Sequence, residues 1–448
     1  MAKRIDVAEL IGAQRFGAFQ LRIVILCGMV QFLDGFDTQA LAYAAPALRA
    51  AWHIAPQALG PVFALGAFGT GLGSVLLGPL ADVAGRRKVM IGCVALFGAL
   101  TFVTAFLTSV DALRIWRLLT GFGLGAALPL TFVVANEFAP VRFRARMIAV
   151  MSCGFAIGAL SGGLLEAALI PFFGWQAIFY FGGLVPLLVA AALLLFLPES
   201  VRFLVARNGR SQAIAAILKK VDPRLEFAPD TEFVIPAEPM RAGFAPAQLF
   251  TEGRAAMTLF LWIVYLVTLG ELNTLNNWLP VAINMAGLPV QRSVLMTTLF
   301  QFGGIAGVLS LGAIADRVGY ARVLAGAYAL LAVSIAAIGA AGGAPLALGA
   351  AIIATGVFLI GANNTLNAFT STLYPTVIRS TGVSWGSSFG RLAGSIAPYL
   401  AGILLGVLPL GVNFLIFALP ALVASLALLG LMHTGSRPVP DIPALVAK

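Results

Sequence analysis

Two short stretches of similar sequence decide the fold. Residues 78–87 read Gly-Pro-Leu-Ala-Asp-Val-Ala-Gly-Arg-Arg, and residues 312–320 read Gly-Ala-Ile-Ala-Asp-Arg-Val-Gly-Tyr. Their aspartates, Asp82 and Asp316, are 234 residues apart, which is about half of the 448-residue chain. Each stretch directly follows a long apolar segment. The chain is therefore predicted to be a duplicated structure in which each half carries a copy of the same loop.

The amino-acid composition excludes a water-soluble protein. Hydrophobic residues make up 60% of the chain and charged residues only 10%, whereas a soluble protein carries roughly 25% charged residues. The 28 Lys and Arg outnumber the 18 Asp and Glu, for a net charge of +10. In a membrane protein this excess gathers in cytoplasmic loops, so the charge predicts a lipid bilayer as partner and no nucleic acid.

The cysteines and histidines give no pattern of a metal or redox site. Cys27, Cys93 and Cys153 each lie in an apolar run without close spacing, and the chain has only two histidines. This excludes a disulfide framework and a zinc site. We expect no metal and no cofactor. Since the sequence also lacks a nucleophile–base constellation, we expect the chain not to be an enzyme.

Twelve segments are long and apolar enough to cross a membrane, which takes about 20 residues each. Six precede and six follow a polar stretch, which predicts an all-α integral membrane protein built as two six-helix bundles. The predicted spans are residues 21–47, 58–81, 88–108, 113–137, 147–170, 176–197, 256–284, 292–315, 320–341, 344–372, 380–405 and 410–432.

The spans divide the chain into five parts. We predict an N-terminal segment over 1–20, a bundle over 21–197, a linker over 198–255, a second bundle over 256–432 and a tail over 433–448. Lys and Arg are concentrated in the first segment, the linker, the tail and the loops on the same side. The opposite loops hold little beyond Arg49 and Arg292. Both termini are therefore expected in the cytoplasm.

Polar side chains inside the spans recur in the first, fourth, seventh and tenth, which suggests that these four helices line a common cavity. Asp34 and Asp37 are three residues apart in the first span, so they share one helix face about 4.5 Å apart along the axis. Two close carboxylates in a poorly solvated site favour retention of a proton by one of them, which a proton carrier needs. The alternative is a structural pair that hydrogen-bonds to a neighbouring helix.

Arg391 lies in the middle of the eleventh span. A guanidinium group cannot lose its charge, so Arg391 needs an anion. Two partners remain open, an internal carboxylate or an anionic substrate held bidentately. Arg379 precedes it by twelve residues, about 18 Å along a helix, and is expected at the cytoplasmic mouth or as a topology signal at the interface.

The remaining polar residues of the spans have two readings each. The asparagines of the seventh and tenth spans can recognise hydroxyl or carboxyl groups, or they can hold helices together; they are Asn273, Asn276, Asn277, Asn363, Asn364 and Asn367. Trp385 can stack on an aromatic ring or pack between helices. Glu166 can be a second proton site or a structural carboxylate. Glycines 121, 123 and 125 are expected to let helices approach closely.

These features together resemble the major facilitator superfamily. Residues 78–87 are similar to its loop signature Gly-x-x-x-Asp-Arg-x-Gly-Arg-Arg, with Val83 where Arg or Lys is usual, and the second copy keeps Asp316-Arg317. Arg117 with the three glycines of the fourth span is similar to a further motif of that superfamily. The resemblance covers nearly the whole chain and implies the twelve-helix facilitator fold.

Within this superfamily, the run Asp34-Gly-Phe-Asp37-Thr38 resembles the aromatic acid:proton symporters of bacteria. The resemblance implies import of benzoate, hydroxybenzoates, protocatechuate or related acids. It also implies proton-coupling roles for Asp34, Asp37 and Glu137, and substrate binding by Arg117 and Arg391. The residues expected in the cytoplasmic gate are Asp82, Arg86, Arg87, Asp316, Arg317 and Arg379.

The sequence therefore predicts a proton-coupled transporter that imports a small aromatic carboxylate by alternating access. Its expected partners are the acid, protons and the bilayer, and it is expected to be a monomer in a bacterial inner membrane. A porter for a sugar, a polyol or a non-aromatic organic acid is the alternative within the same class. A transporter-like membrane sensor is the alternative from another class.

Overall fold

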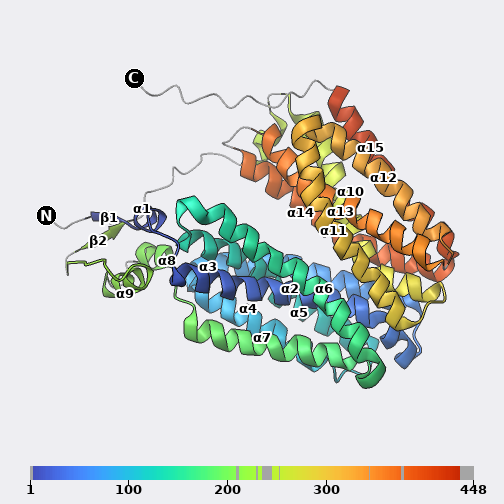
Figure 1. Ribbon diagram of the computed structural model, residues 1–448, viewed down its shortest axis with the longest axis horizontal. Helices are drawn as coiled ribbons and strands as arrows, with labels where there is room; N and C mark the ends of the chain where they lie inside the picture. The colour runs from blue at the N-terminus through green and yellow to red at the C-terminus, as the bar shows by residue number, and fades with distance from the viewer. Residues whose placement is uncertain are drawn as a thin grey trace. The chain divides into compact units, whose positions relative to one another are not determined.

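The computed structural model describes residues 4–207, 211–228, 231–234, 245–251, 253–342, 344–374 and 378–433. In this part of the chain, twelve helices are long and apolar enough to cross a membrane. The predicted all-α membrane fold is therefore confirmed. The first six spans are α2 (Ala18–Trp52), α3 (Gly60–Ala84), α4 (Arg86–Thr104), α5 (Val110–Phe138), α6 (Arg144–Phe173) and α7 (Gln176–Phe196). The last six are α10 (Ala255–Met285), α11 (Val290–Val318), α12 (Tyr320–Ala340), α13 (Pro345–Leu373), α14 (Arg379–Val407) and α15 (Leu410–His433) (Figure 1).

The polar segments at both ends of the first bundle fold together, which the sequence did not predict. The short strands β1 (Arg4–Asp6) and β2 (Glu232–Val234) pair in parallel, with Ile5 opposite Phe233. Between them in the chain lie α1 (Val7–Gly12), α8 (Val201–Ala206) and α9 (Ser211–Val221). Val7, Leu218 and Phe233 join the apolar core of the first bundle. Three short 3-10 helices complete the elements, at Pro56–Leu59, Val141–Phe143 and Ala245–Phe250.

The chain forms two compact units. One contains Met1–Leu41 and Leu65–Met240, and the other contains Ala42–Ala64 and Arg241–Lys448. The second unit thus takes in the end of α2, the start of α3 and the segment that joins them. Within that unit the ring of Phe63 meets the edge of Trp278, with 5.2 Å between ring centres.

The helices pair in the same order in both halves. In the first half α2 packs along α6, α3 along α5 and α4 along α7; in the second, α10 packs along α14, α11 along α13 and α12 along α15. Backbones come close enough that side chains do not fit. A Cβ atom built on Gly158 would collide with the carbonyl oxygen of Phe32, and one on Gly121 with that of Gly66. Close approach of this kind replaces the hydrophobic effect, which does not drive helices together inside lipid.

The duplication extends to the backbone of the two loops. Gly85 and Gly319, which follow Asp82 and Asp316 by three residues, have φ angles of +106° and +102°. Residues with a side chain rarely adopt such angles. Each glycine ends one spanning helix and begins the next, so both halves make this turn with the same conformation.

Helix contact through Gly158 predicts a large effect of one methyl group. Gly158→Ala should lower the free energy of unfolding by about 1–3 kcal/mol, because the added Cβ meets the backbone of Phe32. Gly92→Ala is the matched control, since a Cβ there meets nothing within 4 Å, and alanine favours a helix by about 1 kcal/mol. Denaturant titration of the purified protein in mixed micelles measures both. Equal effects of the two substitutions would contradict the close contact.

Candidate functional site

A buried ion pair joins two helices of the first unit. Arg117 of α5 contacts Asp37 of α2, with 3.2 Å between Nη1 and Oδ2, and the side chains are 7% and 1% exposed. Thr101 of α4 donates a second hydrogen bond to Asp37, at 2.6 Å. The guanidinium group lies 5.5 Å from the ring centre of Phe179 in α7. Arg117 therefore has an internal carboxylate as its anion in this structure.

The two aspartates of the first span are both buried. Asp34 is 6% exposed and Asp37 1% exposed, as their shared helix face predicted. One turn earlier, Gln31 donates to Thr131 of α5 at 2.8 Å. This face of α2 thus carries polar groups toward α4 and α5. Thr101 and Phe179 were missed from the sequence, because single threonine and phenylalanine residues in apolar helices give no signal of their partners.

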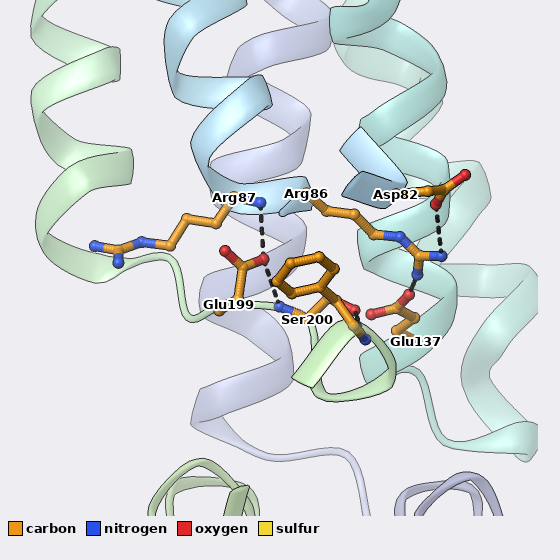
Figure 2. Close-up of polar contacts among 7 residues, drawn as sticks. Asp82, Arg86, Arg87, Glu137, Glu199 and Ser200 are labelled. Carbon is orange, nitrogen blue, oxygen red and sulfur yellow. Dashed lines mark hydrogen bonds and ion pairs between the residues drawn. The ribbon is translucent and has the colours of Figure 1, made fainter. Parts of the chain in front are cut away.

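A second polar group lies at the loop copy of the first unit. Arg86 bonds to Asp82 at 3.4 Å and forms an ion pair with Glu137, the acidic residue at the end of α5. Figure 2 shows Arg86 between these two carboxylates. Twenty residues of α5 separate Glu137 from Arg117, about 30 Å along the helix. Glu137 therefore lies with the loop residues and not with Asp34 and Asp37.

The start of α4 is capped by Glu199, which follows α7. Its Oε1 accepts hydrogen bonds from the backbone N–H groups of Arg87, at 3.0 Å, and Ser200, at 2.9 Å (Figure 2). A carboxylate at this place satisfies free N–H groups and meets the positive end of the helix dipole. The loop aspartate Asp82 could also cap a helix start, but in the structure Glu199 caps α4. A Cβ on Gly85 would lie 2.6 Å from Glu199 Oε2.

The loop copy of the second unit is more open. Asp316 accepts a hydrogen bond from the hydroxyl group of Tyr320 at 2.6 Å, and Asp316 and Arg317 are exposed. Arg379 begins α14, and its side chain lies outside the described residues.

The asparagines of the second unit link α10 with its neighbours. Tyr265 of α10 donates to Asn367 of α13 at 2.8 Å, and Gln301 of α11 donates to Asn276 at 3.1 Å. Asn273 and Asn277 use their amide N–H groups on carbonyls of their own helix. Asn364 and Asn367 do the same in α13. Among the described residues, no donor bonds to the side-chain oxygens of Asn273, Asn277 and Asn364. Tyr265 is a member of this group that was not predicted.

These side chains are partly accessible. Asn364 is exposed, and the other five asparagines are half-buried: Asn273, Asn276, Asn277, Asn363 and Asn367. A surface of this kind can accept hydrogen bonds from hydroxyl groups.

Arg391 and an aromatic stack lie on α14. Arg391 is exposed, and among the described residues no carboxylate lies within 4 Å of its guanidinium group. Two turns earlier, Trp385 is 40% exposed and stacks beside Trp262 of α10, with 6.4 Å between ring centres and 16° between planes. Phe389 stacks on the same tryptophan at 4.6 Å. The helix thus offers a cation for a carboxylate and flat rings for an aromatic group.

Residues suited to a metal ion do not gather in the described part of the chain. It contains no group of three or more His, Cys, Asp and Glu side chains.

The ion pair of Asp37 and Arg117 makes a prediction about stability. Either single change, Asp37→Asn or Arg117→Leu, leaves one buried charge without its partner and should cost about 3–5 kcal/mol. The double variant should cost much less than the sum of the two. Denaturant titration of the four proteins gives the coupling energy.

The exposed pair of Asp111 and Arg114 serves as control for this cycle. Its side chains are 84% and 34% exposed, so its removal should change stability far less. A coupling energy for Asp37 and Arg117 as small as that of the control pair would refute a tight buried contact.

Comparison with known proteins places this architecture in a family. The sequence profile of the Major Facilitator Superfamily matches residues 27–398. A gallate transporter of Pseudomonas putida is 38% identical over 98% of this chain and 98% of its own length. The 4-hydroxybenzoate transporter PcaK of Pseudomonas aeruginosa is 36% identical over 95% of this chain and 96% of its own.

A solved structure has the same fold at low sequence identity. The crystal structure of a D-xylose-proton symporter superposes with a TM-score of 0.74 over 92% of this chain and 97% of its own, at 16% identity. The family also confirms the prediction that the chain is not an enzyme. The profile match, the near full-length relatives and the twelve spans show that this chain belongs to the Major Facilitator Superfamily.

Proposed function

We propose that this chain is a proton-coupled transporter that imports a small aromatic carboxylate across the bacterial inner membrane. It works as a monomer by alternating access, with both termini in the cytoplasm. The relatives named as gallate and 4-hydroxybenzoate transporters support the substrate class, since both compounds are hydroxylated aromatic carboxylates. The observation that carries the proton coupling is the buried pair of Asp37 and Arg117.

The substrate proposal assigns each chemical part of such an acid to side chains of the second unit. Arg391 holds the carboxylate, because its guanidinium group is exposed and has no carboxylate within ion-pair distance among the described residues. Trp385 offers a ring face beside Trp262. The side-chain oxygens of Asn273, Asn277 and Asn364 accept hydrogen bonds from ring hydroxyl groups, which distinguishes hydroxybenzoates from benzoate.

The need for a proton follows from the charge of the substrate. An inside-negative membrane potential opposes entry of one negative charge by about 2.3 kcal/mol per 100 mV. One proton that moves with the acid cancels this cost, and two reverse it. Coupling requires that binding of the proton and binding of the acid favour each other.

Asp37 and Arg117 provide a physical route to this coupling. In the structure the two charges neutralise each other. A proton on Asp37 removes its negative charge and leaves the charge of Arg117 uncompensated, so binding of a proton there favours binding of an anion by the protein. Asp34, one turn away on the same buried helix, is the second acid of this proton site.

The loop residues form the cytoplasmic gate in this proposal. In the first unit, Arg86 holds Asp82 and Glu137 together at the ends of three helices. We therefore assign Glu137 to the gate, where its protonation would release Arg86 and link the gate to proton binding. Arg87, Asp316, Arg317 and Arg379 complete the set from both halves.

Transport in proteoliposomes tests the function. With an imposed gradient, acid outside, the purified chain should accumulate labelled 4-hydroxybenzoate or gallate but not xylose. Asp34→Asn and Asp37→Asn should abolish accumulation driven by the gradient, because neither amide titrates. A protonophore added to the wild type is the control. Wild-type accumulation by Asp34→Asn would contradict its role as a proton carrier, and binding without transport would favour a sensor.

Arg391 gives a prediction about affinity. Arg391→Ala should raise the half-saturating concentration of the acid about 10- to 100-fold, because a hydrogen bond to a charged group contributes about 1.5–3 kcal/mol. Arg391→Lys keeps the charge but loses the bidentate geometry, so its half-saturating concentration should lie between those of the wild type and Arg391→Ala. Leu392→Ala, at a neighbouring residue that is 60% exposed, is the matched control. Equal half-saturation in Arg391→Ala and in the wild type would exclude Arg391 from the site.

A further inference from the structure

The buried carboxyl group of Glu271 has no part in the mechanism described so far. Glu271 lies near the middle of α10 and is 6% exposed. Neither of its oxygens has a hydrogen-bond partner among the described residues, and none of their ion pairs includes it. A carboxylate without a partner is rare inside a membrane protein, so this group calls for a physical explanation.

The internal duplication relates Glu271 to Asp37. The two residues are 234 positions apart, the same separation as between Asp82 and Asp316. Both are buried acids on the first helix of their half. Asp37 is neutralised by Arg117 and by a hydrogen bond from Thr101.

The second half lacks both of these partners. In the first half, Arg117 lies one turn before Gly121, which packs against Gly66. In the second half, Ile352 lies one turn before Gly356, which packs in the same way against Phe300. Gly66 and Phe300 are also 234 residues apart, as are Thr101 and Ile335. Ile352 and Ile335 are fully buried. In the second half, Ile352 and Ile335 therefore occupy the positions that correspond to Arg117 and Thr101. Glu271 thus has an isoleucine at each position where Asp37 has a partner.

The groups that face Glu271 supply no other cation. One titratable group that interacts with it is the phenol of Tyr328 in α12, which bonds to Thr268 of α10. From α15 the backbone of Ala421 faces it, without hydrogen-bond geometry. Helix α13 contains no charged residue. The charged or basic residues of α11, α12, α14 and α15 are Arg292, Asp316, Arg317, Arg322, Arg379, Arg391 and His433, of which only Arg391 lies away from a helix end.

A bound proton would neutralise Glu271 without a basic side chain. Ionised, Glu271 would leave an unpaired charge in an apolar interior, which is strongly unfavourable. Protonated, it is neutral and costs far less. The same helix carries Asn273, Asn276 and Asn277 of the candidate substrate surface, so a movement of α10 on substrate binding also changes the surroundings of Glu271.

We propose that Glu271 is a second proton-binding site of the carrier, the counterpart of Asp37 in the second half, and that it gains and loses its proton during transport. This inference rests on the proposed proton-coupled function. It assigns a proton site to a residue outside the first span and its arginine partner.

Infrared spectroscopy tests the protonation state without any substrate. The purified chain in proteoliposomes at neutral pH should show the C=O stretching band of buried protonated carboxyl groups. Glu271→Gln should remove one component of this band. Asp37→Asn, which removes an acid that is paired with arginine, should leave the band unchanged. Glu166 is also buried and has no hydrogen-bond partner within the described part of the chain. Its own component of the band is identified with Glu166→Gln. An unaltered band in Glu271→Gln would overturn the proposal.

Transport tests the second part of the proposal. Under a gradient of one pH unit, loss of one coupled proton lowers the limiting accumulation of 4-hydroxybenzoate about tenfold. Glu271→Gln should show this loss while its exchange of internal for external substrate, which needs no net proton movement, stays within about twofold of wild type. Accumulation equal to wild type would overturn the proposal.

Two further outcomes keep the tests separate. If Glu271→Gln does not fold, Glu271→Asp decides: a shifted band with retained accumulation supports the proposal, and an unshifted band overturns it. A wild-type chain that moves no aromatic acid would refute the proposed function, whereas the infrared comparison would still report on Glu271.

Discussion

Contact between helix backbones at glycine is the constraint on which the rest of this structure depends. In lipid the apolar faces of two helices gain nothing from leaving water, so their association needs close packing. Gly158 and Gly121 provide it in the first unit, where a single methyl group would meet a carbonyl oxygen, and Gly356 does so in the second. These contacts set which helices pair, and the same pairing recurs in both halves. They thereby decide which polar side chains face each other.

Neutralisation of buried charge is the second constraint, and the two halves meet it differently. In the first, Asp37 has Arg117 and Thr101. In the second, Glu271 has apolar residues at the corresponding places. A fold made by duplication permits such divergence, because each half packs through its own glycines. The two acids therefore have different surroundings, one beside an arginine and a hydroxyl group and the other among apolar side chains.

Much of the architecture was predictable from the sequence, because lipid imposes simple rules. Length and hydropathy marked all twelve spans, and the two aspartates 234 residues apart marked the duplication. Burial of Asp34 and Asp37 followed from the cost of charge in hydrocarbon. The asparagines and Arg391 were selected as candidate binding residues for the same reason, since polar groups in a membrane are few.

The partners of these residues were not predictable, because they depend on how helices rotate against one another. Arg117 was expected near a substrate, and its partner Asp37 appears only once α2 and α5 are packed. Glu137 was grouped with the aspartates of the first span, although α5 carries it to Arg86 at the other end. Likewise, nothing in the pattern after residue 197 indicated that Glu199 caps α4 or that β2 pairs with β1.

The bond between Glu199 and the start of α4 has a mechanical consequence. It holds the segment after α7 against the turn between α3 and α4. One carboxyl oxygen thereby closes a loop of more than a hundred residues. Arg207 adds a second tie from the same segment, through its hydrogen bond to the carbonyl of Val83. Sliding of the ends of α3, α4 and α7 past one another would have to break both hydrogen bonds. Any movement that keeps these bonds must occur in other parts of the chain.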